Sequence, residues 1–196
     1  PDSVTTIGRS VFAGCSSLET VSIGNSVTSI GKMAFYSCYD LKTVSIPSSV
    51  TTIGTSTFNK CTSLETVIIG NSVTSIGDYA FYQCSSLETV SIGNSVTSID
   101  YYAFSGCSSL ETVSIPDSVT SIGDGAFTDC LSLKNVFIPD SVTSIGDRVF
   151  SGCGSLSICS IDVDEDGMVS IPNTWSMIKY YSFFQCNNLK SVSIPN

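Results

Sequence analysis

The sequence predicts a repeat solenoid, in which 23-residue units stack with a parallel sheet on one face and short helical or 3₁₀ turns and loops on the other. Three observations predict it. A phenylalanine, a cysteine and a leucine recur with a common period, each unit ends in a Val-x-Ile alternation, and a Pro or Gly follows that alternation. A single unit is too short to bury its own apolar side, so each must stack on the next. The recurring residues are Phe12, Phe35, Phe58, Phe81, Phe104, Phe127 and Phe150, then Cys15, Cys38, Cys61, Cys84, Cys107, Cys130 and Cys153, then Leu18, Leu41, Leu64, Leu87, Leu110, Leu133 and Leu156.

The units divide the chain without a break. Seven units of 23 residues occupy 1–161, and an eighth unit over 162–194 has 33 residues. We therefore interpret residues 1–196 as a single domain of eight repeats. The ten extra residues of the eighth unit lie before Pro172, after which the columns resume. Neither end carries an atypical polar cap, so we expect either a longer array or ends that are covered by self-association.

Each unit contains two recognisable local patterns. The alternation in Val21-Ser22-Ile23 predicts one short strand per repeat, and eight stacked strands give a parallel sheet on the order of 40 Å long. The Ala-Phe-x-x-Cys segment has the spacing of one face of a helical turn, so we expect a helical or 3₁₀ turn on the opposite side. Glycines that recur at one position, such as Gly31 and Gly54, predict either a positive φ or a close backbone contact there.

Composition excludes several classes of function. Eight basic and seventeen acidic residues give a net charge of −9, which argues against nucleic acid and anionic membranes as partners. With 42% apolar residues the chain is not of the disordered type, yet no apolar run is long enough to insert into a membrane. The chain has no histidine, which removes Ser-His-Asp and Cys-His catalysis and histidine metal sites. Since it also lacks a nucleophile motif and a phosphate loop, we expect a non-enzymatic protein.

The columns resemble those of a known family. Leu-x-x-Val-x-Ile followed by Pro/Gly-x-Ser-Val-Thr-Ser-Ile-Gly-x-x-Ala-Phe-x-x-Cys is similar to the BspA-type leucine-rich repeats, and the resemblance covers the whole chain. It implies a curved solenoid with the sheet on the concave face, in a secreted or cell-surface protein of host-associated bacteria or of protists. Several members resemble adhesins that bind host matrix proteins or other microbes. The motif consists almost wholly of core positions, so it names no ligand.

The nine cysteines are interpreted as small buried hydrophobic residues with inert thiols. Eight of them occupy one column, and Cys159 stands in a valine column. Stacked parallel side chains rarely meet the dihedral that a disulfide needs. A ladder with 23-residue steps also lacks the short-spaced pair typical of metal sites.

The side chains that the core pattern leaves free on the strand side are mostly Thr, Ser, Glu and Lys. One interpretation is a plain solvated sheet face. Another is a broad, weakly acidic contact surface with an aromatic anchor. A third is an ice-binding surface, because regular Thr-x-Ser rungs resemble those of ice-binding solenoids. The candidate ligand-binding residues are Phe137, Ile68, Ile158, Glu65, Glu88 and Glu111.

Tyrosines cluster around the Ala-Phe segments of repeats two, four and five, opposite the strands. They either fill space between coils, with the hydroxyl in water, or form a binding patch. They are Tyr36, Tyr39, Tyr79, Tyr82, Tyr101 and Tyr102.

The insert at 162–171 has two interpretations. Its Asp-Gly step between apolar residues predicts a hairpin that protrudes from the solenoid. Alternatively, Asp162, Asp164 and Asp166 match the first half of a calcium loop, although Asn173 stands where such loops carry a bidentate Glu. Calcium at these three aspartates is the one cofactor that the sequence suggests.

Two functional hypotheses follow. The favoured one is a protein-binding or adhesion module of a secreted or cell-surface protein, whose solenoid face engages a protein or glycan ligand such as host matrix. The alternative is a structural spacer that has no ligand of its own.

Overall fold

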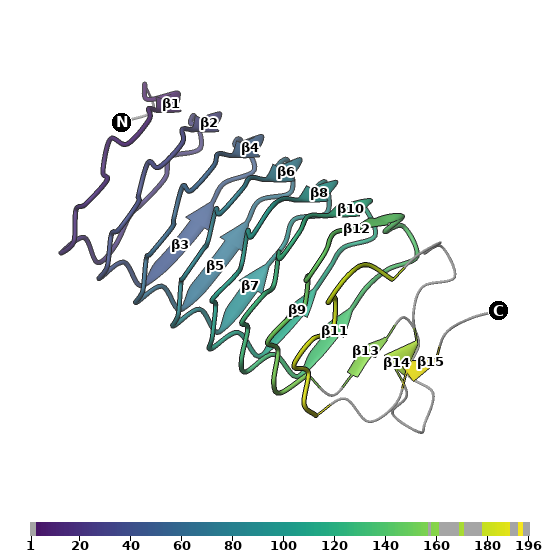
Figure 1. Cartoon of the computed structure of the whole chain (residues 1–196). Coiled ribbons are helices and arrows are strands. Elements are labelled where there is room, and N and C mark those ends of the chain that lie inside the picture. The colour runs from purple at the N-terminus through teal and green to yellow at the C-terminus, as the bar shows by residue number, and fades with distance from the viewer. Residues whose placement is uncertain (1–2, 157, 161–168, 171–177, 189–191, 194–196) are drawn as a thin grey trace.

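The chain forms a single stack of coils, one coil per repeat, as the periodicity predicts (Figure 1). The computed structural model describes residues 3–156, 158–160, 169–170, 178–188 and 192–193. Every paired strand in it is parallel to its neighbours. The predicted solenoid with a parallel sheet is therefore confirmed.

In repeats two to six the predicted strand begins one residue after the Glu/Lys column, whereas in the first repeat Thr20 forms only an isolated bridge with Thr43. In the first of these strands, exposed Thr43 and Ser45 alternate with buried Val44 and Ile46. We call the outward-facing side chains of this column, with the residue before each strand, the strand face. The strands are β3 (Thr43–Ile46), β5 (Thr66–Ile69), β7 (Thr89–Ser91), β9 (Thr112–Ser114), β11 (Asn135–Phe137), β13 (Ile158–Ser160), β14 (Val169–Ser170) and β15 (Val192–Ser193). They form three sheets in the orders β3-β5-β7, β9-β11-β13 and β14-β15.

A second, shorter strand in most repeats shows that the expectation of one strand per repeat is wrong. These strands form one seven-stranded sheet along another edge of the stack (Figure 1). Two residues are too few for an alternation to be visible in the sequence. Bonds between coils define the strand instead, such as the one from the Thr28 N–H to the Thr5 carbonyl at 2.8 Å. The strands are β1 (Thr6–Ile7), β2 (Ser29–Ile30), β4 (Thr52–Ile53), β6 (Ser75–Ile76), β8 (Ser98–Ile99), β10 (Ser121–Ile122) and β12 (Ser144–Ile145).

The Ala-Phe-x-x-Cys segment forms successive turns, and no described residue of the chain is helical. The expected helical or 3₁₀ turn is therefore wrong. The Tyr36 N–H donates to the Met33 carbonyl at 3.2 Å, whereas the next-door Phe35 N–H donates to Thr57 of the following coil at 2.9 Å. Met33 and Ser37 have φ values of 59° and 58°, which interrupt a right-handed helix. The segment does not form a helix because every second backbone N–H donates its hydrogen bond to the next coil and not within the segment.

The recurring glycines allow coils to approach one another. A Cβ on Gly31 would lie 2.8 Å from the carbonyl carbon of Gly8, and one on Gly77 would lie 2.8 Å from the Ile53 oxygen. Neither glycine has a positive φ. Of the two predicted reasons for this column, the close backbone contact is the correct one.

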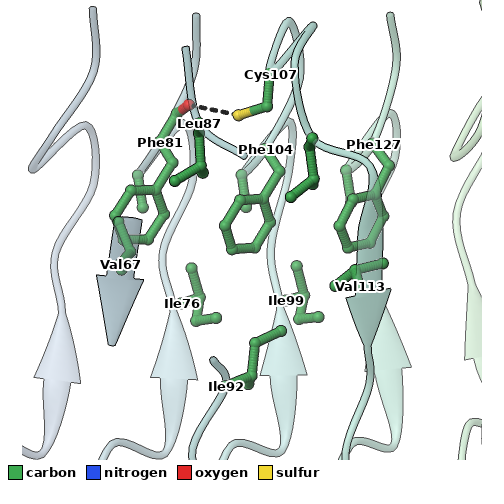
Figure 2. Close-up of a cluster of buried hydrophobic side chains, with 14 of the residues drawn as sticks. Val67, Ile76, Phe81, Leu87, Ile92, Ile99, Phe104, Cys107, Val113 and Phe127 are labelled. Atoms are coloured by element: carbon green, nitrogen blue, oxygen red, sulfur yellow. Dashed lines mark hydrogen bonds between the residues drawn. The ribbon is translucent and has the colours of Figure 1, made fainter. Parts of the chain in front are cut away.

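A column of phenylalanine rings runs through the core (Figure 2). Neighbouring rings from Phe12 to Phe183 are stacked, with centroids 5.1–5.8 Å apart. Phe81, Phe104 and Phe127 are fully buried. Burying such a side chain contributes about 1.5–3 kcal/mol relative to leaving it exposed. The column is thus a main source of the stability of the stack.

The cysteines form a second buried column. Figure 2 shows the Cys107 thiol donating to the Phe81 carbonyl, with Sγ and oxygen 3.2 Å apart. Seven of the described cysteines are buried and none is in a disulfide, which confirms the prediction for them. Cys15 is exposed, so the prediction is wrong there, because the first coil has a neighbouring coil on one side only. The side chain of Cys159 lies outside the described residues.

The last residues of the insert contribute strand β14 to the C-terminal part of the stack. Val169 and Ser170 pair with Val192 and Ser193, at the same 23-residue offset that relates the strands of other neighbouring repeats. The aspartates at 162, 164 and 166 lie outside the described residues, so the protruding hairpin and the calcium site both stay predictions.

Thiol reactivity tests the cysteine column. In the native protein we expect a thiol reagent to modify Cys15 rapidly and Cys84 slowly, because burial shields Cys84 and raises its pKa to about 12. Peptide mapping by mass spectrometry after timed labelling measures this, and a Cys15→Ser variant removes the fast phase. In denaturant without reductant all nine thiols should react. Fast native labelling of Cys84, or a clear shortfall of thiols in denaturant, contradicts the prediction.

Truncation of one ring tests the phenylalanine column. We expect Phe104→Ala to lower the free energy of unfolding by about 3–5 kcal/mol, since it leaves a cavity between two stacked rings. Phe137→Ala is the matched control, because that ring is 44% exposed and its loss should change stability by less than about 0.5 kcal/mol. Urea denaturation followed by circular dichroism provides both values, and equal losses would show that the column is not a main source of stability.

Candidate functional site

Two large apolar side chains interrupt the polar strand face. Ile68 is 50% exposed and Phe137 is 44% exposed. Each stands between two buried neighbours in the sequence, Val67 and Ile69 for Ile68 and Val136 and Ile138 for Phe137, so the period of two directs it outward. Both are therefore where the sequence predicts them.

The structure does not bring these two side chains together. Ile68 lies opposite Ser45 and Ser91 on the neighbouring strands. Phe137 lies three coils further along, a separation of about 14 Å at the usual strand spacing. Ile158 lies in the coil after Phe137, but its backbone pairs with Asn135, and its side chain is outside the described residues.

Two ion pairs span neighbouring coils on the strand face. Lys42 Nζ lies 2.9 Å from Glu19 Oε2, and Lys134 Nζ lies 3.0 Å from Glu111 Oε2. The hydrogen bond and charge of Lys42 lower the pKa of Glu19. All four side chains are more than half exposed, so these pairs add little to stability and mainly cancel charge.

The next two acidic residues along the strand face lie outside these two ion pairs, although the charge of Lys42 also acts on Glu65 from the neighbouring coil. Glu65 and Glu88 are exposed and form no ion pair within the described part of the chain. Glu88 and Glu111 share one shallow depression of the strand face, whereas Glu65 does not line it. The three acidic candidates thus form a row in which Glu65 and Glu88 are outside any ion pair of the described residues and Glu111, at one end, is neutralised by Lys134. The depression is lined by Glu88, Thr89, Ser109, Glu111, Thr112 and Ser132.

Phe137 lies in a second depression at the end of the strands. Ser114, Ile115 and Pro116 are among the residues that line it with Phe137. The ring is therefore both solvent-exposed and next to a recess, a setting in which it can anchor a partner.

A third depression lies on the turn side, away from the strand face, and involves residues that the sequence pattern does not single out. Tyr101 and Tyr102, which the sequence places in the tyrosine cluster, line it with Arg148 and Tyr180. Tyr180 follows Asp147 by 33 residues, so the longer eighth repeat hides the fact that they share a column. The shared column of Tyr180 and Asp147 can be found in the sequence when the repeat positions are counted again from the end of the insert.

The described residues contain neither a metal-binding cluster nor a helix that could span a membrane. Among them, no three His, Cys, Asp or Glu residues converge to hold a metal ion. The predicted calcium ligands Asp162, Asp164 and Asp166 lie outside those residues. Nor does the described chain include a helix of the length and hydrophobicity needed to cross a bilayer.

Comparison with known proteins places the chain in a family. The model of the BspA type leucine rich repeat region matches it in six copies, over 1–111, 74–167 and 167–196. A leucine-rich repeat protein of T. pallidum is 35% identical, with a TM-score of 0.73 over 84% of this chain and 72% of that one. A leucine-rich repeat protein from Bacteroides ovatus is 26% identical, with a TM-score of 0.70.

The match to the Bacteroides ovatus protein covers all of this chain but 53% of the other, so the chain spans about half of that relative's length. None of the curated proteins gives a match. The resemblance expected from the sequence motifs is nevertheless confirmed by the family model and by the T. pallidum structure. The chain belongs to the BspA-type leucine-rich repeat family.

Proposed function

We propose that the chain is a non-enzymatic protein-binding module of a secreted or cell-surface protein, and that it engages its partner through the strand face. The observation that carries the proposal is the exposure of Ile68 and Phe137 on a sheet face that is otherwise polar. An exposed aromatic side chain beside a recess, such as Phe137, is typical of binding hot spots. A face that served only to keep the chain in solution has no need of either.

The charge of the strand face indicates the chemistry of the partner. Glu65 and Glu88 form no ion pair within the described region, and the chain as a whole has a net charge of −9. A protein surface with Lys or Arg opposite this row and an apolar pocket opposite Phe137 is therefore complementary to it. The family resemblance supports placement at the cell surface or outside the cell as part of the proposal, and an adhesive role is its specific form.

Removing the aromatic anchor tests the proposal. We expect Phe137→Ala to weaken binding to a matrix protein or mucin about tenfold or more, because hot-spot truncations typically cost 2 kcal/mol or above. The wild-type chain is first screened against an immobilised panel of matrix proteins and mucins, and a hit is titrated with both chains. Val11→Ser is the control, since Val11 is 56% exposed in the first coil and away from strands β3 to β13.

Two outcomes contradict this prediction. If Phe137→Ala and Val11→Ser weaken binding equally, the strand face is not the contact surface. If a chain shown to be folded binds nothing on the panel, the spacer hypothesis replaces the binding hypothesis. Repeating the screen with calcium and with a chelator also tests the proposed ion at Asp162, Asp164 and Asp166.

The acidic row makes a separate prediction. We expect Glu88→Gln to weaken binding more than Glu111→Gln, because the Glu111 carboxylate is already paired with Lys134. The Glu88→Gln variant should also lose part of the salt dependence of binding, since screening acts on uncompensated exposed charge. Titrations at low and high salt measure both effects. Identical affinities for the two variants would remove the acidic row from the interface.

A further inference from the structure

The turn side carries a pocket that is built from one column of the repeat. We call it the tyrosine pocket, and its volume is about 160 Å³. Each lining residue occupies one of the two positions that follow the recurring glycine, or that follow Asp100 or Lys179 where these replace it, in four successive repeats. The lining residues are Tyr101, Tyr102, Asp124, Asp147, Arg148 and Tyr180.

Aromatic pairs bound the pocket at its two ends. The ring centroids of Tyr101 and Tyr102 are 4.3 Å apart at an interplanar angle of 65°, and those of Tyr180 and Tyr181 are 4.0 Å apart at 51°. Tyr101, in a coil with neighbouring coils on both sides, is 41% exposed. Rings that served only as filling between coils would be covered, so the exposure favours a contact role over the filling role.

The two coils between the aromatic pairs have no aromatic residue in this column. Gly125 stands where the previous coil has Tyr102, and its φ is +61°. A Cβ on Gly125 would lie 2.7 Å from the Tyr102 ring, so only a glycine lets that ring lie across the next coil. The surface is therefore hollow between Tyr102 and Tyr180 instead of being a continuous row of rings.

The carboxylates of the pocket are held by the backbone. Asp124 Oδ1 accepts the Asp147 N–H at 2.9 Å, and Asp147 Oδ1 accepts the Tyr180 N–H at 3.3 Å. Within the described residues, the second oxygen of each carboxylate accepts no hydrogen bond. Two fixed acceptors thus remain available to a ligand hydroxyl.

The guanidinium of Arg148 supplies the donor. It lies 5.5 Å from the centroid of the Tyr181 ring, which holds it at one end of the pocket. Burial raises the pKa of Tyr102, and the charge of Arg148 acts against that rise, as expected for a cation that also faces the other aromatic pair. Arginine offers five N–H donors, so a hydrogen bond to the Tyr102 hydroxyl and contact with the Tyr181 ring leave donors free.

This set of groups selects one class of ligand. A pyranose ring has a face of C–H bonds that packs on tyrosine rings and a rim of hydroxyls that pair with carboxylates and guanidinium. A quaternary ammonium group would also suit an aromatic cage, but Arg148 already places a positive charge there. An anionic ligand would meet Asp124 and Asp147. We propose that the tyrosine pocket binds a neutral carbohydrate, as a second binding site on the side away from the strand face.

A glycan titration with matched variants tests this proposal. The probes are neutral oligosaccharides of glucose, galactose, mannose and N-acetylglucosamine, with sialylated oligosaccharides and choline as counter-probes. We expect at least one neutral oligosaccharide to bind, and Tyr180→Ala to weaken that binding about tenfold. Tyr39→Ala is the matched control, because Tyr39 is 44% exposed but does not line the pocket. Calorimetry measures the affinities, after circular dichroism has shown that each variant is folded.

The outcomes separate this proposal from the strand-face proposal. Loss of binding in Tyr180→Ala but not in Tyr39→Ala or Phe137→Ala supports a carbohydrate site at the pocket. The proposal is overturned if no neutral oligosaccharide binds to the folded chain, if choline or a sialylated probe binds better, or if Tyr39→Ala has the same effect as Tyr180→Ala. Loss in Phe137→Ala alone would assign the glycan to the strand face instead.

Discussion

The whole stack depends on one constraint, the fixed offset between backbone groups that bond neighbouring coils. The Thr74 N–H donates to the Thr51 carbonyl, and the Thr97 N–H donates to the Thr74 carbonyl, so each coil both gives and receives the same bonds. One residue gained or lost between two bonding positions would leave amides unpaired between coils, which costs free energy. The buried columns of Phe, Cys and Leu repeat without slippage because the backbone allows no other register.

The same constraint decides where the chain is free to vary. Met33 and Tyr102 hold left-handed conformations that non-glycine residues rarely adopt, and the coils on either side keep them there. The strand face and the positions after the recurring glycine are two of the places where residues change from repeat to repeat, as are the two positions between the recurring Phe and Cys. Both proposed binding surfaces lie in them.

The sequence alone is enough to predict the columns, the parallel sheet of the strand face and the outward direction of Ile68 and Phe137, since each follows from a period. The second strand could not be predicted in this way, because two residues such as Ser75 and Ile76 carry no period and are defined by partners in other coils. The tyrosine pocket was hidden for a related reason. It becomes clear that Tyr180 and Tyr101 line the same depression only when the coils are counted across the insert.

The row of positions that forms the tyrosine pocket has a consequence for how such proteins diverge. Each coil corresponds to one repeat of the sequence, so gain or loss of a whole repeat between Tyr102 and Tyr180 would move the two aromatic ends apart or together by about 4.8 Å. An added copy of such a coil would bring a further carboxylate that accepts a hydrogen bond from a backbone N–H of the next coil. Recombination within the gene would then alter the length of the ligand that fits, while the groups that contact each sugar ring stay the same.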